Sequence, residues 1–306
     1  MNYILPIQCG AVDMASFKFK NYNKKLKKFF FKKYYSSVYI KKNIKEENLG
    51  FYLAGLIEGD GYISITNKNN VILGITFNIK DQTLAEKLLK FLGKGYIIKR
   101  KTNSIELRFS DKITLYKIIN IINGKFRTPK IDQLQKVITF LNTKYFMDIN
   151  RLPLDSSLLN LNSWLAGFID ADGYFYIRYS SKQITCNFSL EQRIIYPKTQ
   201  KSYYNILNQI SLFLKIKLVI RNRVNKKNSY YIIKVENQKS LKLLINYLNN
   251  YPLLSSKYLD FLDWQKSFNE ILLKNHLKNE GKNIIFSAKN NMNNKRTYFN
   301  WDHLKF

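Results

Sequence analysis

A nine-residue pattern that occurs twice limits the folds available to this 306-residue chain more than any other feature. The segment 53–61 has the sequence LAGLIEGDG, and the segment 165–173 has the sequence LAGFIDADG. In both copies an apolar helical stretch ends in acidic residues and a glycine, after which apolar and polar residues alternate as in a strand. An internal repeat of this kind indicates two copies of one structural unit, so we expect the two halves to fold alike.

The elements that follow each motif are predicted in the same order. Alternating residues predict strands over 62–66, 72–80, 96–100 and 105–109, and again over 174–178, 184–191, 218–224 and 230–235. Helical spacing predicts helices over 84–92, 112–123 and 131–142, and again over 204–214, 240–249 and 256–273. Asn48 and Ser163 are suitable N-caps for the two motif helices. Each half is therefore predicted to be an αββαββα unit, which places the chain in the mixed α/β (α+β) class.

Composition divides the chain into segments. A basic N-terminal extension occupies residues 1–47, in which positions 18–45 hold eleven lysines and no acidic residue. The first repeat is predicted over 48–150 and the second over 163–273, joined by a linker over 151–162 that is rich in Asn and Ser. A basic C-terminal tail follows at 274–306. We expect both basic segments to serve nucleic-acid binding or to be solvated extensions.

Charge and composition limit both the molecules that the chain could bind and the classes of protein to which it could belong. The chain carries 51 Lys and Arg residues against 21 Asp and Glu residues, a formal charge of +30, which favours a polyanionic partner. A hydrophobic fraction of 45% excludes a mainly disordered basic chain, and no apolar run reaches the roughly 18 residues of a membrane span. Two cysteines, Cys9 and Cys186, exclude a disulfide framework, and two histidines, His276 and His303, argue against histidine-based catalysis.

The acids that end the motif helices are placed unfavourably for stability. Asp60 and Asp172 lie at helix C-termini, where the helix dipole disfavours negative charge by a few tenths to about 1 kcal/mol. Small residues at 54–55 and 166–167 favour close packing of the two helices, which would bring the carboxylates together and raise a pKa unless a cation is present. Ordinary turn-forming acids are the alternative, but the presence of both acids favours a divalent magnesium ion, which prefers oxygen ligands.

The two motifs resemble the signature motifs of the LAGLIDADG homing endonucleases, in the single-chain form with two repeats. The resemblance extends over about residues 48–270, and the segments 188–192 and 253–264 resemble the C-terminal repeat of fungal organellar-intron members. It implies two αββαββα repeats related by a pseudo-twofold axis between the motif helices, with two four-stranded antiparallel sheets forming a saddle over DNA. It further implies that one chain, as a monomer, cuts both strands of double-stranded DNA at a long asymmetric target.

Residues with AT-rich codons, such as Phe, Tyr, Ile, Asn and Lys, far outnumber Gly, Ala, Arg and Pro, whose codons are GC-rich. This bias is typical of AT-rich genomes, which are often organellar. Together with the resemblance, it predicts a mitochondrial protein.

The resemblance also implies a set of metal ligands. Asp60 and Asp172 would bind magnesium ions next to the scissile phosphates, with help from the backbone carbonyls of Gly59 and Ala171. The other acidic position of each motif is more often structural in the family, and it is occupied here by Glu58 and Asp170.

Two further pairs of catalytic residues follow from positions that match the family. A polar residue at the end of the second strand would hold an active-site water, and it is Asp81 in the first half and Gln192 in the second. A lysine before a late helix of each repeat would reach the active site, and these lysines are Lys130 and Lys257. Because Asp81 and Gln192 differ, the two half-sites are not expected to be chemically equivalent.

Bases would be read by side chains that alternate outward from the sheets toward the major groove. The residues predicted to face DNA are Ser64, Thr66, Lys68, Asn78, Lys80, Arg100, Arg108, Tyr176, Arg178, Ser189, Arg221 and Arg223. The strand residues predicted to face the core are Ile63, Ile65, Phe175 and Ile177.

Other functions stay open on the sequence alone. An RNA maturase would use the same fold to bind its host intron RNA and assist splicing, with or without cleavage. A non-catalytic DNA-binding regulator is a second alternative, although the presence of both Asp60 and Asp172 argues against it. A structural or membrane-surface protein is the least favoured.

Overall fold

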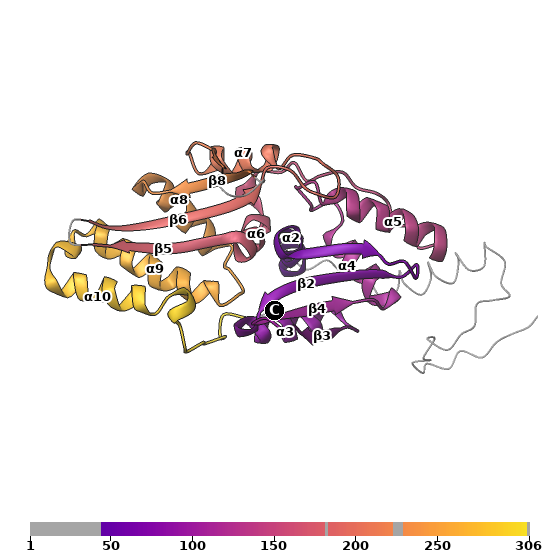
Figure 1. Cartoon of the computed structure of the whole chain (residues 1–306), viewed down its shortest axis with the longest axis horizontal. Helices are drawn as coiled ribbons and strands as arrows, with labels where there is room; N and C mark the ends of the chain where they lie inside the picture. Colours follow the sequence, from indigo (N-terminus) through magenta and orange to yellow (C-terminus); the bar gives the residue numbers. More distant parts are fainter. Residues whose placement is uncertain (1–43, 181–182, 223–228, 305–306) are drawn as a thin grey trace, which may run out of the picture.

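The computed structural model describes residues 44–180, 183–222 and 229–304. Most of the basic N-terminal extension and the predicted base-reading residue Arg223 therefore lie outside the described residues. Two halves with similar architecture lie side by side, and the two motif helices meet at the centre (Figure 1). These helices are α2 (Ile44–Asp60) and α6 (Trp164–Asp172).

The first half places one sheet against a layer of helices. In chain order it contains α2, β1 (Gly61–Ile65), β2 (Val71–Asn78), η3 (Ile79–Asp81), α3 (Gln82–Leu92), β3 (Tyr96–Lys99), β4 (Ser104–Phe109), α4 (Lys112–Ile122) and α5 (Ile131–Tyr145). The strands form an antiparallel sheet in the order β1-β2-β4-β3. Because side chains alternate along a strand, one face of this sheet is apolar and buried while the other is polar.

The second half repeats this plan. After the short η4 (Leu159–Leu161) it contains α6, β5 (Gly173–Tyr179), β6 (Ile184–Arg193), α7 (Tyr204–Phe213), β7 (Val219–Asn222), β8 (Ser229–Val235), α8 (Gln238–Asn250) and α9 (Lys257–Leu272). Its antiparallel sheet has the equivalent order β5-β6-β8-β7. Two helices close each half, so the predicted αββαββα order is confirmed and is followed by one further helix.

Most of the predicted core positions are buried. Ile63, Phe175 and Ile177 face the core as expected, with exposed fractions of 5% or less. The prediction for Ile65 is wrong, because this side chain is 37% exposed. Ile65 is the last residue of β1, and the chain continues directly into the exposed turn at 67–70, beyond the reach of the core.

The predicted N-cap of the first motif helix is also wrong. Helix α2 is described over Ile44–Asp60, so Asn48 lies inside it, and the backbone carbonyl of Asn48 accepts a hydrogen bond from the Ser163 hydroxyl. Ser163 does precede α6, but the backbone N–H of Trp164 is bound by the side chain of Asn162 at 3.1 Å. Ser163 therefore ties the two motif helices together at their N-terminal ends and does not cap its own helix with its side chain.

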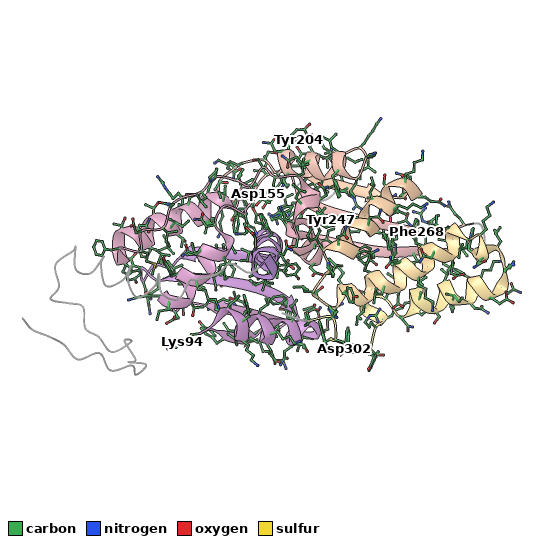
Figure 2. All side chains as sticks on the ribbon, turned by 180° about the vertical axis from the view of Figure 1, so that it is seen from behind. Lys94, Asp155, Tyr204, Tyr247, Phe268 and Asp302 are labelled. Atoms are coloured by element: carbon green, nitrogen blue, oxygen red, sulfur yellow. The ribbon has the colours of Figure 1, made fainter. Side chains whose placement is uncertain are left out.

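The C-terminal tail is folded and crosses between the halves. It contains η5 (Asn275–Leu277), α10 (Asn279–Asn290) and η6 (Asn293–Lys295), and α10 packs on α9 and β5. The chain then runs back toward α3 of the first half, where the Lys87 Nζ donates to the carbonyl of the buried Leu304 at 2.6 Å (Figure 1). Seen from behind, Asp302 in this segment lies next to the boundary between the halves (Figure 2).

Across the part of the chain that the structure describes, every helix is too short or too polar to cross a membrane.

Candidate active site

The two motif helices touch through their backbones. A Cβ atom placed on Gly55 would lie 2.0 Å from the carbonyl oxygen of Trp164, and one on Gly167 would lie 1.9 Å from the carbonyl oxygen of Tyr52. No side chain larger than hydrogen fits at these distances, which explains the glycines inside two helices. The close packing predicted from the small residues is confirmed, and it brings the C-terminal ends of both helices to one place.

Glu58 holds a loop of the first half in position. Its buried carboxylate accepts hydrogen bonds from the backbone N–H groups of Arg127 (2.9 Å) and Thr128 (2.6 Å), and from the Trp164 indole of the other motif helix (2.7 Å). This loop leads directly into α5 and carries Lys130. Glu58 is therefore a structural acid that positions the predicted active-site lysine.

Asp170 performs the equivalent task in the second half. Its carboxylate accepts hydrogen bonds from the backbone N–H groups of Leu254 (2.7 Å) and Ser255 (3.1 Å), and from the Tyr52 hydroxyl of α2 (2.6 Å). The loop that it holds leads directly into α9, which begins with Lys257. Each structural acid thus receives one hydrogen bond from the opposite motif helix, as the pseudo-twofold relation between the halves requires.

Burial raises the pKa of Glu58 to about 7, although the hydrogen bonds to its carboxylate oppose the shift. The folded protein therefore holds this proton more tightly than the unfolded chain between about pH 4.5 and pH 7, and the free energy of unfolding should fall as pH rises through that window.

We expect the free energy of unfolding of Glu58→Gln to fall less with rising pH than that of the wild type, because an amide does not titrate. Urea unfolding at several pH values checks the prediction, with Asp132→Asn as the control, because Asp132 is half-buried and forms an ion pair with the exposed Lys201. If the free energy of unfolding of Glu58→Gln falls with pH as steeply as that of the wild type, the prediction is contradicted.

Lys130 and Lys257 bind the carbonyl groups that end the motif helices. The Lys130 ammonium donates to the carbonyls of Ile57 (3.1 Å), Gly59 (2.8 Å) and Gly61 (2.7 Å). The Lys257 ammonium donates to the carbonyls of Ile169, Asp170 and Ala171 at 2.8 to 3.4 Å. A cation at a helix C-terminus is electrostatically favourable. Burial lowers the pKa of Lys257 and lowers that of Lys130 to about 8, while nearby carboxylates oppose both shifts.

Asp60 and Asp172 lie at the ends of these helices and influence each other. Desolvation by the surrounding protein raises the pKa of Asp172 to about 6, and the charge of Asp60 adds to the shift. Desolvation also raises the pKa of Asp60, although this side chain has one side open to solvent, and Lys257 and Lys130 oppose that shift. Two carboxylates with raised pKa values beside two cations form a site in which added positive charge stabilises the ionised acids.

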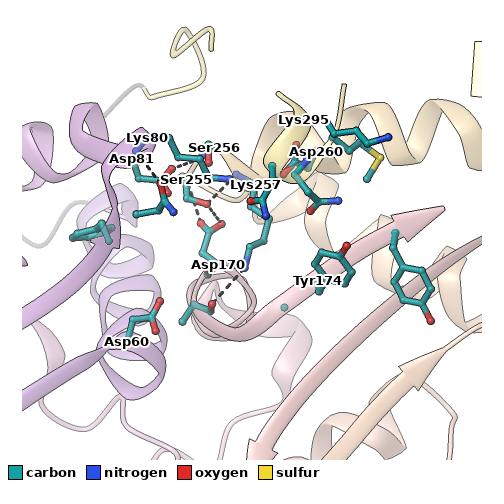
Figure 3. Close-up of a pocket in the computed structure, with 18 of the residues that line it drawn as sticks. Asp60, Lys80, Asp81, Asp170, Tyr174, Ser255, Ser256, Lys257, Asp260 and Lys295 are labelled. Carbon is teal, nitrogen blue, oxygen red and sulfur yellow. Dashed lines mark hydrogen bonds between the residues drawn. The ribbon is translucent and has the colours of Figure 1, made fainter. Parts of the chain in front are cut away.

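The residues predicted to hold a water differ in their surroundings. The Gln192 amide donates to the Asp172 carboxylate at 2.9 Å, within its own half. Asp81 is buried and reaches across to the second half, where its carboxylate accepts from the backbone N–H of Ser256 at 2.7 Å. Figure 3 shows Asp81 beside the loop that carries Lys257, with Asp60 across the same cleft of about 500 Å³. Gln192 and Asp81 therefore have different hydrogen-bond partners in the two halves, and the expected chemical difference between the half-sites stays a prediction.

The oxygen atoms at this place suit a hard divalent cation. Among the described residues, no group of three or more His, Cys, Asp or Glu side chains could hold a metal ion. A cation would therefore be held by Asp60 and Asp172 together with backbone carbonyls and water, which is a donor set that magnesium accepts. The carbonyl of Gly59 already accepts from Lys130, but a carbonyl oxygen has a second lone pair to offer.

The described residues that were predicted to face DNA lie on or beside the polar sheet faces. Register pairs place Arg108 opposite Tyr96, and Arg221 opposite Tyr230, on the faces turned away from the helices. Thr66 and Lys68 lie in the turn after β1, and Lys80 lies in η3 at the rim of the cleft. Arg100 directly follows β3, and its side chain is 45% exposed. The members that lie within strands are exposed or half-buried: Ser64, Asn78, Tyr176, Arg178 and Ser189.

Several residues of the site were not predicted. Tyr52 and Trp164 occupy equivalent positions three residues before the helix glycines, so the repeat itself could have identified them as partners of the structural acids. The cleft is also lined by Asn293 and Lys295 of the C-terminal tail. Arg296 anchors this tail segment through ion pairs with Asp260 (3.0 Å) and Asp263 (2.5 Å) of α9. No local sequence signal points to that contact.

Comparison with known proteins gives the same assignment. Residues 53–141 and 165–268 match the LAGLIDADG endonuclease family, so the match includes both motifs and both halves. This chain belongs to the LAGLIDADG endonuclease family. It is 33% identical over 305 residues to the intron-encoded DNA endonuclease aI3 of Saccharomyces cerevisiae, covering 85% of this chain and 73% of that protein. It is 34% identical over 251 residues to the uncharacterized cox1 intron-2 37.2 kDa protein of Schizosaccharomyces pombe, covering 80% and 74%.

One relative has a different described activity. The intron-encoded RNA maturase bI4 of Saccharomyces cerevisiae is 33% identical over 162 residues, which cover 52% of this chain and 23% of that protein.

Solved structures of LAGLIDADG homing endonucleases share the fold. The I-SmaMI structure bound to cleaved DNA superposes with a TM-score of 0.65 at 22% identity, covering 84% of this chain and 99% of that chain. I-GzeII in complex with its DNA target gives a TM-score of 0.62 at 20% identity, covering 81% and 99%. The two-repeat architecture with two four-stranded antiparallel sheets is therefore that of the LAGLIDADG endonucleases.

Proposed function

We propose that this LAGLIDADG protein is an intron-encoded homing endonuclease that hydrolyses both strands of double-stranded DNA at a long asymmetric target. The observation that carries the proposal is the meeting of Asp60 and Asp172 at the ends of two helices whose backbones touch. The 33%-identical relative that is described as an intron-encoded DNA endonuclease supports it. Relatives that include a cox1 intron protein and a mitochondrial protein support a mitochondrial location.

Asp60 and Asp172 would hold divalent cations, with the carbonyls of Gly59 and Ala171 as further ligands, and magnesium is our proposed metal. When bound, the cation would supply Lewis-acid activation of the scissile phosphate, which removes the need for a histidine base. The Lys130 ammonium donates all three of its N–H groups to backbone carbonyls. We therefore infer that Lys130 acts through its positive charge, which reduces the electrostatic repulsion between the scissile phosphate and the nearby carboxylates.

Lys257 would play the same part for the other strand. We propose that Gln192 orients Asp172, and that the Asp81 carboxylate holds a water in the cleft. These different partners would give the two strands different cleavage rates.

The chain is proposed to act as a monomer, because each half brings its own motif helix, lysine and sheet to one shared site. Each half would read one side of the target with the polar face of its sheet. Since the side chains on the two faces differ, the target is expected to be asymmetric.

Assistance of intron splicing is a second candidate function. The observation in its favour is the similarity of half of this chain to a protein described as an RNA maturase.

We expect the purified protein to cut plasmid DNA that carries the intronless junction of its host gene when magnesium is present, and not in EDTA. Cleavage is read as linear DNA on a gel. A plasmid with the intron inserted at that junction is the matched control and should stay intact, because the insertion separates the two sides of the target. Equal cutting in EDTA would contradict the proposed metal dependence, and no cutting of either plasmid would contradict the endonuclease assignment.

A further inference from the structure

Glu106 lies on the polar face of the first sheet and is nevertheless buried. Its neighbours Ile105 and Leu107 face the core, so alternation turns Glu106 to the face proposed to read DNA. Only 3% of Glu106 is exposed, because three side chains of that face close over it. They are identified by the hydrogen bonds that they donate to its carboxylate.

The three donors are Tyr62, Arg100 and Arg108. The Tyr62 hydroxyl and the Arg108 Nε donate to Glu106 Oε1 at 2.6 Å and 2.7 Å, and the Arg100 Nη2 donates to Oε2. The Tyr62 ring reaches this position by lying against Gly74, where a Cβ would be 2.5 Å from the ring. The arginine side chains keep 45% and 21% of their surface open to solvent. One carboxylate thus binds two guanidinium groups that are partly open to solvent.

Among its described residues, the second half does not repeat this arrangement. Sheet register pairs Thr76 with Glu106 in the first half, and the equivalent pair in the second half is Glu191 with Ile232. Glu191 forms an ion pair with Arg221 at 3.0 Å, in which the arginine is 55% exposed and the glutamate 25% exposed. Tyr174 has the position of Tyr62 but is 49% exposed and stacks on Tyr176. The buried carboxylate is therefore a property of one sheet and not of the fold.

We propose that Glu106 is a specificity-determining positioning residue, which holds Arg100 and Arg108 in the orientation that recognises guanine in the major groove; this rests on the proposed endonuclease function. Arginine binds the O6 and N7 atoms of guanine through two parallel N–H groups, so its orientation decides whether the contact forms. A guanidinium already held by Glu106 loses little freedom on binding. The negative charge beneath the arginines also disfavours their use as general phosphate contacts.

The test compares base preferences of the wild-type chain and Glu106→Gln. Target sites are first selected by cleavage of a pool of randomised duplex DNA with the wild-type protein, and every single-base-pair variant of the selected site is then assayed for cleavage. We expect Glu106→Gln to reduce discrimination by about tenfold at the guanine positions read by β3 and β4, which is within the range of one bidentate contact. Affinity for random duplex DNA should rise, because one negative charge is removed.

Two matched variants separate positioning from a structural role. Glu191→Gln breaks the exposed ion pair of the second sheet, and it should leave the base preferences of the first half-site as in wild type. Tyr62→Phe removes one hydrogen bond to Glu106 and should relax the same positions as Glu106→Gln, to a smaller extent. In an Arg100→Lys/Arg108→Lys background, Glu106→Gln should have no further effect on discrimination. A melting curve for each variant monitors folding. If Glu106→Gln does not fold, the base preferences of Tyr62→Phe provide the test.

Two results would overturn the role of Glu106 while leaving the endonuclease assignment intact. One is that Glu106→Gln has the same base preferences as the wild type. The other is that Glu106→Gln still reduces base discrimination in the Arg100→Lys/Arg108→Lys background. If the wild-type protein cuts no member of the pool, the proposed function itself fails and the role of Glu106 falls with it.

Discussion

Asp60→Asn and Asp172→Asn should each abolish double-strand cleavage while DNA binding is retained. Each substitution removes one of the two carboxylates proposed to hold the divalent cation, and metal activation is worth several kcal/mol in such reactions, or about a thousandfold in rate. The fold should survive, because both residues lie at the ends of helices and their ionised forms are disfavoured by desolvation. Loss of a negative charge facing the phosphates should leave DNA affinity equal or higher.

The assay uses supercoiled plasmid with the selected target and follows the linear product over time, with a gel shift for binding. Asp132→Asn is the matched control, since Asp132 is also a helix-terminal aspartate near a lysine, but its ion pair with Lys201 is at the surface. It should cut at the wild-type rate. Magnesium-dependent linear product from either active-site variant would show that these carboxylates are not the metal ligands.

Gly167→Ala should lower the free energy of unfolding by about 3 kcal/mol or more, at the upper end of what one added methyl group costs in a packed interior. The new Cβ would lie 1.9 Å from the Tyr52 carbonyl oxygen and 2.9 Å from the Leu56 nitrogen. These are backbone atoms of α2, so they cannot move aside as a side chain can. The helices must separate, which also disturbs the placement of Asp60 and Asp172, and we expect cleavage to fall with stability.

Urea unfolding of Gly167→Ala and of Gly74→Ala tests this argument. At Gly74 the atoms met by the new Cβ belong to the ring of Tyr62, a side chain that can rotate away, and the site is in a strand. Rotation of the ring would give up the hydrogen bond from Tyr62 to Glu106, so we expect a cost of about 1 kcal/mol, which is still well below that of Gly167→Ala. Equal stability of Gly167→Ala and wild type would mean that the helices do not pack as closely as the structure has them.

Much of the fold was predictable because its signals are local. Alternation over 230–235 and helical spacing over 204–214 depend on neighbouring residues, and both elements form within a residue or two of the predicted bounds. The inclusion of residues 44–47 in α2 could not be found in this way, since the polar residues directly before Asn48 carry no apolar periodicity. The error at Ile65 has a similar origin, because alternation does not tell where the core ends.

The same distinction between local signals and long-range contacts applies to the residues of the site. Asp60 and Asp172 were marked by the repeat and by their unfavourable position at helix ends. The contact of Asp81 with Ser256 joins residues far apart in the sequence, and it exists only because the two halves pack in one particular way. Glu106 was passed over for the same reason, since a glutamate within a strand gives no sign of which strands lie beside it. The order β1-β2-β4-β3 had to be known before its partners could be identified.

The path of the C-terminal segment bears on how such chains can be recombined. Halves taken from different relatives are natural building blocks for new target preferences, and the 151–162 linker looks like the obvious crossover point. In this chain, however, residues 297–304 travel with the second half but end against the first, with Leu304 buried and its carbonyl held by Lys87. A hybrid joined at the linker would place this segment on a foreign α3. Exchange of the Lys87 surface together with the second half would preserve the junction.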